Sequence, residues 1–374
     1  MEVAALLRGS SPDHSINHSE HGYEQAVVNP LNGTSCTPTV NCPTKEIPSI
    51  SFLGALVAVF QRVCHRLVRK LSSLAKIFLD PKDGLDTLLL RAARYSNNLN
   101  DTIDHDHYHL SINTGNSTIY QGVLHPSETR IAIKTVRWFG ADSDAVKRTL
   151  REVHVWSKLR HDNVLPLVGI TTIPNHMVSI VTEWMPRGNA HDYVQDVNVD
   201  PRPLIVGISR GLFYLHTHVS GPIVHGDLKG MNVLISMEGQ ALLTDFGHSH
   251  LANSSFSMTV DPPRGGSWNW LAPENVESEL YSITLPGDVW AFGMTALELF
   301  SRRKPYHDAS NVPSILLRIL RGPPGRPNDE CTNCRMTDAW WDVCNMCWER
   351  DISLRPEIPV LKTMIEQLAN SEIQ

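Results

Sequence analysis

The sequence predicts an α+β fold in which a small β-rich lobe precedes a larger helical lobe, with a cleft between the two. Runs rich in β-branched residues, separated by turn-like stretches, predict strands at 106–112, 117–124, 130–137, 166–172 and 177–183. A helical pattern at 144–159 interrupts these strands. Beyond residue 190 the long segments follow helical periodicity, at 203–219, 286–301, 312–321, 337–348 and 357–369.

The chain ahead of these elements divides into two parts. Residues 1–48 contain five prolines and a single aromatic residue, Tyr23. They bury too little apolar surface to offset the entropy of ordering, so we predict a disordered tail. Residues 49–104 form a predicted helical extension with a short second helix at about 85–95. The compact domain is then predicted over 105–370.

Within the extension, residues 50–79 combine an apolar stripe with five basic side chains and no acidic one. Apolar residues from Leu53 to Phe78 recur every three or four positions, which places them on one helical face. Two interpretations stay open. A basic amphipathic helix can lie on an anionic membrane surface, which predicts peripheral membrane contact, or its apolar face packs on the rest of the protein.

Composition excludes several classes of protein. The 374 residues are 41% hydrophobic and 19% charged, with a net charge of −6, so no general nucleic-acid coat is expected. No run of 18 or more apolar residues occurs, which argues against a membrane-spanning helix. The short apolar run after Glu2 does not predict a secretory signal. Seven cysteines, an odd number, are typical of a reduced intracellular chain, so we expect a cytoplasmic protein.

Four separated motifs carry the chemistry. They are Ile131-Ala132-Ile133-Lys134 at the end of a predicted strand, Glu152 in the following helix, HGDLKGMN at His225–Asn232, and Asp245-Phe246-Gly247 followed by Ala272-Pro273-Glu274. Their order and spacing resemble the signature motifs of the protein kinase family, over about residues 105–370. The resemblance implies the two-lobed protein kinase fold and transfer of a phosphoryl group from ATP to protein hydroxyl groups.

The resemblance implies that Lys134 and Glu152 act at the phosphates of the nucleotide. Lys134 would hold the α- and β-phosphates of ATP, and Glu152 would orient that lysine through an ion pair. Asp245 and Asn232 would hold Mg²⁺, because carboxylate and amide oxygens suit this hard cation. These residue types fit the reaction, since phosphoryl transfer depends on positioning and charge neutralisation.

The resemblance places the acceptor hydroxyl at Asp227 and Lys229. Asp227 would accept the proton of the substrate hydroxyl, and Lys229 would lie beside the transferring phosphate. Lys229 resembles the serine/threonine pattern, and Ser267 occupies a position whose hydroxyl contacts the catalytic Asp and Lys in such kinases. The Cys347-Trp348 pair looks closer to the tyrosine-kinase-like branch. The chain thus resembles a tyrosine-kinase-like serine/threonine kinase of the fungal type, acting on Ser and Thr of protein substrates.

The adenine ring would lie between the lobes. In the family, backbone groups of the connection between the lobes meet the adenine edge, which here assigns Glu183 and Met185. Thr182 would be a small gatekeeper residue, and Ala132 and Leu234 would sandwich the ring.

The predicted glycine-rich loop departs from the family pattern. Ile112, Thr114 and Ser117 stand where three glycines belong, with Ile119 aligned to the family's following valine. Only Gly115, an extra glycine of the family, remains for contact with ATP. Glycine lets backbone N–H groups approach phosphates closely, so the replacements should weaken the phosphate cradle.

The resemblance also implies supporting contacts in the interior of the domain. They are a stack of Trp156, His225 and Phe246 anchored by Asp288, and an ion pair between Arg355 and Glu274. Gly226 replaces the arginine that usually pairs with an activation-loop phosphate. The sequence therefore predicts activity without that phosphate, although the loop contains hydroxyl residues such as Ser249.

Two cysteine pairs raise a separate question. Cys331 and Cys334, and Cys344 and Cys347, have the doublet spacing of a zinc site. The second pair lies in a predicted helix, which favours core and loop thiols over a metal site.

Two functions from different classes remain. The intact Lys134, Glu152, Asp227, Asn232 and Asp245 favour an active Mg²⁺- and ATP-dependent serine/threonine kinase. The degenerate glycine-rich loop keeps open a pseudokinase scaffold with weak or no catalysis.

Overall fold

The computed structural model describes residues 85–104, 111–114, 117–136, 143–174, 177–251, 267–278 and 282–371. The segments predicted as a disordered tail, 1–48, and as an amphipathic helix, 50–79, lie outside these residues, so both stay predictions. Within the described ranges, no helix is both long and apolar enough to cross a membrane.

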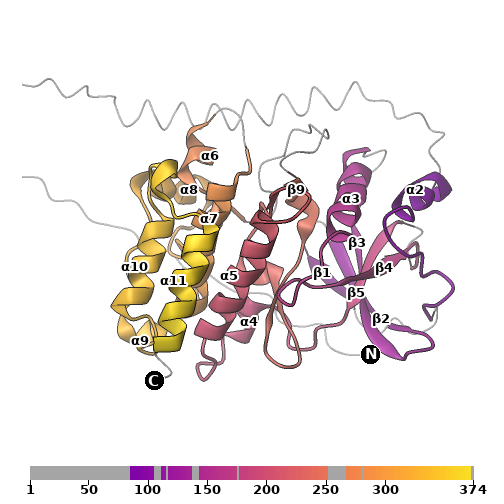
Figure 1. Ribbon diagram of the computed structural model, residues 1–374, viewed down its shortest axis with the longest axis horizontal. Helices are drawn as coiled ribbons and strands as arrows, with labels where there is room; N and C mark the ends of the chain where they lie inside the picture. Colours follow the sequence, from indigo (N-terminus) through magenta and orange to yellow (C-terminus); the bar gives the residue numbers. More distant parts are fainter. Residues whose placement is uncertain are drawn as a thin grey trace, which may run out of the picture. The chain divides into compact units, whose positions relative to one another are not determined.

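The early strands form one antiparallel sheet with the order β1-β2-β3-β5-β4 (Figure 1). Its strands are β1 (Ser111–Thr114), β2 (Ser117–Leu124), β3 (Thr129–Val136), β4 (Leu167–Thr171) and β5 (Ser179–Glu183). In β3 the side chains of Ile131 and Ile133 are fully buried, whereas Ala132 and Lys134 alternate to the other face. Helix α3 (Ser143–Trp156) lies beside this sheet.

The segment ahead of the sheet completes the small lobe. Helix α2 (Leu85–Ala92) contributes to the same apolar core as α3. The chain then runs parallel to β4: Leu99 N donates to Ile170 O at 2.9 Å, and Ile170 N donates to Asn97 O at 2.8 Å. Ile103 joins a second apolar cluster with Ile131 and Ile133. The described part of the expected extension 49–104 is therefore bound to the sheet.

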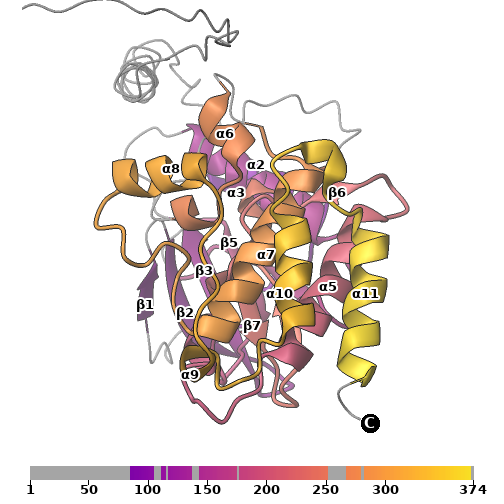
Figure 2. The same ribbon diagram turned by 90° about the vertical axis from the view of Figure 1, so that its left-hand side faces the viewer.

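The large lobe is helical (Figure 2). Its helices are α4 (Ala190–Tyr193), α5 (Arg202–His216), α6 (Pro273–Glu277), α7 (Leu285–Ser301), α8 (Val312–Arg321), α9 (Asp329–Thr332), α10 (Asp338–Cys347) and α11 (Ile358–Ser371). Figure 2 shows α7 beside α10, and α11 beside α5. Nearly all of α7 is buried because most of its residues are apolar, and the acidic residues within it have buried partners. Strands first and helices second confirm the predicted α+β fold.

Short elements between α5 and α7 carry the residues of the third and fourth motifs. They are β6 (Ile223–Val224), β7 (Val233–Ile235), β8 (Ala241–Leu243), β9 (His250–Leu251) and the single-turn helices η1 (Gly230–Asn232), η2 (Phe246–His248) and η3 (Ser267–Trp270). β6 pairs with β9 and β7 pairs with β8. These pairings hold the loop after β6 and the turn after β8 in place.

Candidate active site

Three residues from separate elements meet in one ion-pair cluster. Lys134 lies in β3, Glu152 in α3, and Asp245 directly after β8. The ammonium of Lys134 donates to Glu152 Oε1 and to Asp245 Oδ1, each at 2.8 Å. The side chain of Glu152 is 3% exposed, whereas that of Asp245 is 39% exposed. The cluster is therefore accessible to solvent on the Asp245 side.

The electrostatics of this cluster keep Lys134 and Asp245 charged. Burial alone would lower the pKa of Lys134, but the carboxylates of Asp245 and Glu152 outweigh it and raise that pKa. Burial would raise the pKa of Asp245, yet the Lys134 ammonium holds it well below its usual range. Burial raises the pKa of Glu152, and contact with Lys134 opposes that rise. The cluster thus presents a cation and a carboxylate together at neutral pH.

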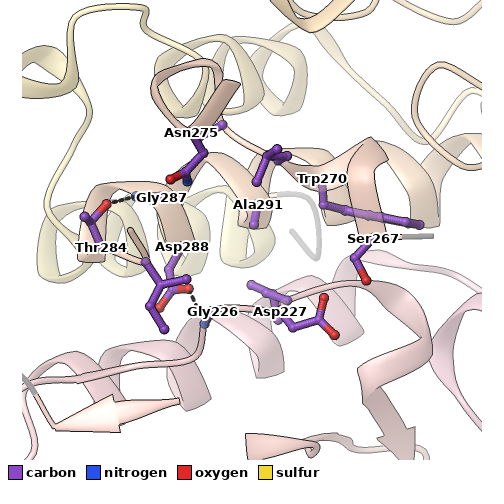
Figure 3. Close-up of a pocket in the computed structure, with 13 residues that line it drawn as sticks. Gly226, Asp227, Ser267, Trp270, Asn275, Thr284, Gly287, Asp288 and Ala291 are labelled. Carbon is purple, nitrogen blue, oxygen red and sulfur yellow. Dashed lines mark hydrogen bonds between the residues drawn. The ribbon is translucent and has the colours of Figure 1, made fainter. Parts of the chain in front are cut away.

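A second cluster surrounds Asp227 in the loop after β6. Its Oδ2 accepts a hydrogen bond from the Lys229 ammonium at 2.7 Å and another from the Asn232 amide at 2.9 Å. The same ammonium donates to Ser267 Oγ at 2.6 Å, and Figure 3 shows the Asp227 carboxylate turned toward Ser267. Asp227 also lines the cavity drawn in Figure 3. Its carboxylate is therefore held by two donors beside an accessible hollow.

Aromatic contacts support both clusters from the interior. The ring centroids of Trp156 and Phe246 are 5.1 Å apart, and those of His225 and Phe246 are 5.4 Å apart. Asp288 of α7 accepts a hydrogen bond from the backbone N–H of His225 at 2.7 Å. These contacts confirm the predicted stack and its anchor. Burial lowers the pKa of His225, so the imidazole is neutral in this apolar stack.

Gly226 has a backbone conformation that favours glycine. Its φ is +78°, and its N–H donates to Asp288 Oδ1 at 2.9 Å (Figure 3). An added Cβ would lie 2.9 Å from Ile283 Cδ1 and 3.1 Å from the His248 carbonyl oxygen. Backbone strain and packing both disfavour a side chain here. The position fits glycine and does not fit the arginine that the resemblance leads one to expect.

Arg355 connects two distant parts of the large lobe. Its guanidinium donates to both carboxylate oxygens of Glu274, at 2.7 and 2.8 Å. It also lies over the Trp290 ring, 5.1 Å from the centroid. The predicted ion pair is confirmed, and its bidentate geometry is the stronger form of such a contact.

A sequence model of the family described as protein tyrosine and serine/threonine kinase matches residues 110–365, most of the chain. The chain belongs to this kinase family. Within it, the two clusters above lie in the motifs that define the family's chemistry.

Curated kinases of several organisms resemble this one. Serine/threonine-protein kinase STY46 of Arabidopsis thaliana is 28% identical over 67% of this chain and 42% of its own length. Probable serine/threonine-protein kinase roco6 of Dictyostelium discoideum is 28% identical over 68% of this chain and 12% of its own length. A receptor-like protein kinase of Ipomoea nil is 27% identical over 80% of this chain and 27% of its own length. This kinase chain spans less than half the length of these relatives.

The residues predicted to contact adenine lie on both lobes of the kinase. Thr182 is buried near the end of β5 and pairs across the sheet with Ala132 of β3. Glu183 is the exposed last residue of β5, and Met185 follows in the connection to α4. Leu234 is half-buried in β7 of the large lobe.

Asn232 and Asp245 have the chemistry to hold Mg²⁺. The amide nitrogen of Asn232 donates to Asp227 O at 2.7 Å and to Asp227 Oδ2 at 2.9 Å, so among the described residues its amide oxygen is left for a metal. Asp245 adopts the left-handed region, φ 64°, which aspartate tolerates better than most residues. No group of three or more His, Cys, Asp or Glu in the described part of the chain could hold a metal. A carboxylate and an amide fit a hard cation that keeps water ligands.

The hairpin that replaces the glycine-rich loop is only partly described. Its register pairs Thr114 with Ser117 and Ile112 with Ile119, and Ile119 also lies opposite Lys134 in β3. Ser117 is 7% exposed and Ile112 is 42% exposed. Gly115 lies outside the described residues. The positions aligned with glycine are therefore ordinary strand residues with side chains.

A buried carboxylate that no sequence motif marked organises the large lobe. Glu298 of α7 is fully buried and accepts hydrogen bonds from the Gly230 N–H and the Trp270 Nε1–H, each at 2.9 Å. It also pairs with His191 Nδ1 at 2.7 Å. The available signal was an acidic residue inside the otherwise apolar run of α7, because such a residue needs several partners.

Ser249 is one of the hydroxyl residues of the activation loop. Ser249 is fully buried, and its hydroxyl donates to the His225 carbonyl oxygen at 2.8 Å. It is a structural hydrogen-bond donor and is not accessible for phosphorylation. The other hydroxyl residues of the loop, from Ser254 to Thr259, lie outside the described residues.

The cysteine pairs lie in different environments. Cys344 and Cys347 are buried in α10, where burial raises the pKa of Cys344 to about 12 and also raises that of Cys347. Cys331 is half-buried in α9, and Cys334 is exposed just after this helix. Neutral buried thiols are poor zinc ligands because zinc binds the thiolate. This placement fits the interpretation as core and loop thiols.

Proposed function

We propose that this chain transfers the γ-phosphate of ATP to serine and threonine hydroxyl groups of proteins. The observation that carries the proposal is the double contact of Lys134 with Glu152 and Asp245. This arrangement joins a phosphate-binding cation, the carboxylate that orients it and a metal-binding carboxylate, as phosphoryl transfer requires.

The groups around Asp227 support the acceptor side of the reaction. In this proposal the Asp227 carboxylate accepts the proton of the substrate hydroxyl as that oxygen attacks the γ-phosphorus. The bond from the γ-phosphorus to the β,γ-bridging oxygen breaks, and ADP leaves. Lys229 donates to Asp227 and can move its ammonium to the transferring phosphate, which gains stabilisation as charge develops. Asn232 holds the Asp227 carboxylate in orientation through its amide nitrogen.

Mg²⁺, when bound, supplies charge neutralisation at the phosphate oxygens. Asp245 and Asn232 are the residues that would hold it, for the reasons given above. The contact between Lys229 and Ser267 supports serine and threonine as acceptors. In serine/threonine kinases, as the resemblance implies, a hydroxyl at the position of Ser267 contacts the catalytic lysine.

Initial rates of phosphotransfer from Mg²⁺-ATP to a mixed protein substrate test this function. The purified chain should transfer label, chelation of Mg²⁺ should abolish transfer, and Asp227→Asn should lower the rate by about a hundred-fold or more. Asparagine keeps the shape of the side chain but cannot accept the proton. Equal rates for the two proteins would show that the label comes from a contaminant.

A pseudokinase scaffold is the second candidate, and one observation favours it. Ile112 and Ser117 carry side chains in the hairpin where the family uses glycine. The phosphotransfer assay separates the two candidates, and calorimetric titration with ATP, with and without Mg²⁺, shows whether an inactive chain still binds the nucleotide. A scaffold would show no phosphotransfer under any condition, whether or not it binds the nucleotide.

A further inference from the structure

A basic groove lies on the large lobe. It has a volume of about 380 Å³ and is bordered by α4, η3, the loop after α7 and the first turns of α8. Five of its lining side chains are basic or can become so: His191, Arg302, Arg303, Lys304 and His307. No acidic residue lines it. The chain as a whole has a net charge of −6, so this groove is a local reversal of charge.

His191 pairs with the buried Glu298, whereas the two arginines and the lysine of the groove have no ion-pair partner among the described residues. Arg302 donates to the backbone carbonyl oxygens of Phe300, Cys331 and Val197, and its Nε is buried without a partner in the described part of the chain. Arg303 and Lys304 are exposed. Neither forms an ion pair with a described residue, and the Arg303 guanidinium contacts His307 Nε2 at 3.3 Å. Cations gathered this way create a positive potential that attracts acidic groups.

The floor of the groove is apolar. Tyr306 is 5% exposed and Ile315 is 9% exposed, and Ala309 is half-buried next to them. The groove therefore combines a basic rim with a place for an apolar side chain. A peptide with acidic and apolar residues matches both features better than a small anion does.

The groove and the active site share a wall. Ser267 and Trp270 of η3 line the cavity beside Asp227 in Figure 3, whereas Asn269 between them lines the groove. Asn269 Nδ2 also donates to the Pro305 carbonyl oxygen at 2.6 Å, which ties η3 to the loop after α7.

Glu298 adds a second connection. It bridges His191 of the groove and the backbone of Gly230, three residues beyond Asp227. The groove is therefore held in a fixed position relative to Asp227 by two sets of buried hydrogen bonds.

We propose that this groove binds an acidic segment of the protein substrate, with carboxylates on the basic rim and an apolar side chain on the floor. It thereby selects acceptor Ser or Thr residues that lie near Asp and Glu in sequence. The proposal rests on the proposed function for its role in catalysis. Charge complementarity of this kind sets specificity and encounter rate more than total affinity.

Fluorescence anisotropy of a labelled peptide tests the groove without any need for catalysis. The probe is a peptide of Glu, Asp and Leu residues with Ala at the acceptor position, compared with the same peptide carrying Gln and Asn. The full chain should bind the acidic peptide at least about ten-fold more tightly. The double variant Arg303→Glu with Lys304→Glu should lose this preference, because it reverses the rim charge.

The matched control is Arg94→Glu with Lys158→Glu, which changes the net charge equally at two exposed positions of the small lobe. It should keep the preference. Equal binding of both peptides by the wild-type chain, or equal loss in the control, would overturn the proposal. Tighter binding of a single-stranded oligonucleotide than of the acidic peptide would overturn it too, in favour of a nucleic-acid site.

Kinetics with Ser at the acceptor position then separate the two proposals. The groove variant should raise KM for the acidic peptide about ten-fold with kcat unchanged, and should leave KM for the neutral peptide unchanged. Equal KM increases for both peptides would overturn substrate selection by the groove. Selective binding without any phosphotransfer by the wild-type chain would leave the groove standing as a binding site and contradict the proposed kinase activity.

Discussion

Among single residues, Lys134 is the most tightly constrained. Its ammonium forms ion pairs with two carboxylates, and its side chain is only 19% exposed. We predict that Lys134→Met lowers the phosphotransfer rate at least about a hundred-fold, about 2.7 kcal/mol. Thermal melting checks that the variant is folded. A folded variant that keeps most of the wild-type rate would contradict the assignment.

A substitution at Gly226 tests whether packing around this position requires glycine. We expect Gly226→Ala to reduce the free energy of unfolding by about 1–3 kcal/mol, since it combines positive φ with contacts to Ile283 and His248. Gly188→Ala is the control, because Gly188 has φ +70° but nothing within 4 Å of an added Cβ. Urea unfolding of both variants measures the difference. Equal losses would show that packing around Gly226 does not matter.

At the scale of elements, the stretch Asn97–Ile103 ties the segment ahead of the sheet to β4. An added Cβ at Gly169 would lie 2.4 Å from Leu99 Cδ1 and 2.8 Å from the Asn97 carbonyl oxygen. We therefore expect Gly169→Ala to cost about 1–3 kcal/mol in urea unfolding, because the segment must move away from the sheet.

Gly122→Ala in β2 is the matched control, since its added Cβ would meet only ordinary contacts at 3.5 Å or more. That variant should be neutral or slightly more stable. A Gly169→Ala variant as stable as Gly122→Ala would mean that the stretch Asn97–Ile103 does not pack against β4 in solution.

The ion pair between His191 of α4 and Glu298 of α7 predicts that the free energy of unfolding depends on pH. The hydrogen bond to Glu298 raises the pKa of His191 from its usual 6.5. The ion pair therefore contributes its full stabilisation below pH 6.5 and loses it as the pH rises through the raised pKa. The difference in unfolding free energy between wild type and His191→Gln should be largest just below pH 6.5 and should shrink at alkaline pH. A difference that stays constant with pH would contradict the ion pair.

Most helices and strands were predictable because their hydrophobic periodicity and β-branched runs are strong signals. The expected helix at 286–301 is α7 at Leu285–Ser301, and the expected strand at 117–124 is β2. The stretch Asn97–Ile103 was not predicted as a partner of β4, because its pairing depends on the distant Ile170 and on space at Gly169. Local sequence does not encode such a contact.

At the scale of the whole molecule, the fold brings together residues that are far apart in the chain. Lys134 and Asp245 are separated by 111 positions and meet at 2.8 Å. Motif order predicted this meeting because the resemblance places the motifs in one cleft. The basic groove and Glu298 escaped prediction, since no motif marks them and their partners come from α4, η3 and the loop after α7.

The central claim is that this chain phosphorylates serine and threonine through Asp227 and Lys134. Phosphoamino-acid analysis of a protein substrate, after incubation with the full chain, Mg²⁺ and γ-labelled ATP, tests it most directly. The label should appear on phosphoserine and phosphothreonine and should disappear with Asp227→Asn. Absence of label with the wild-type chain, or label confined to phosphotyrosine, would contradict the claim.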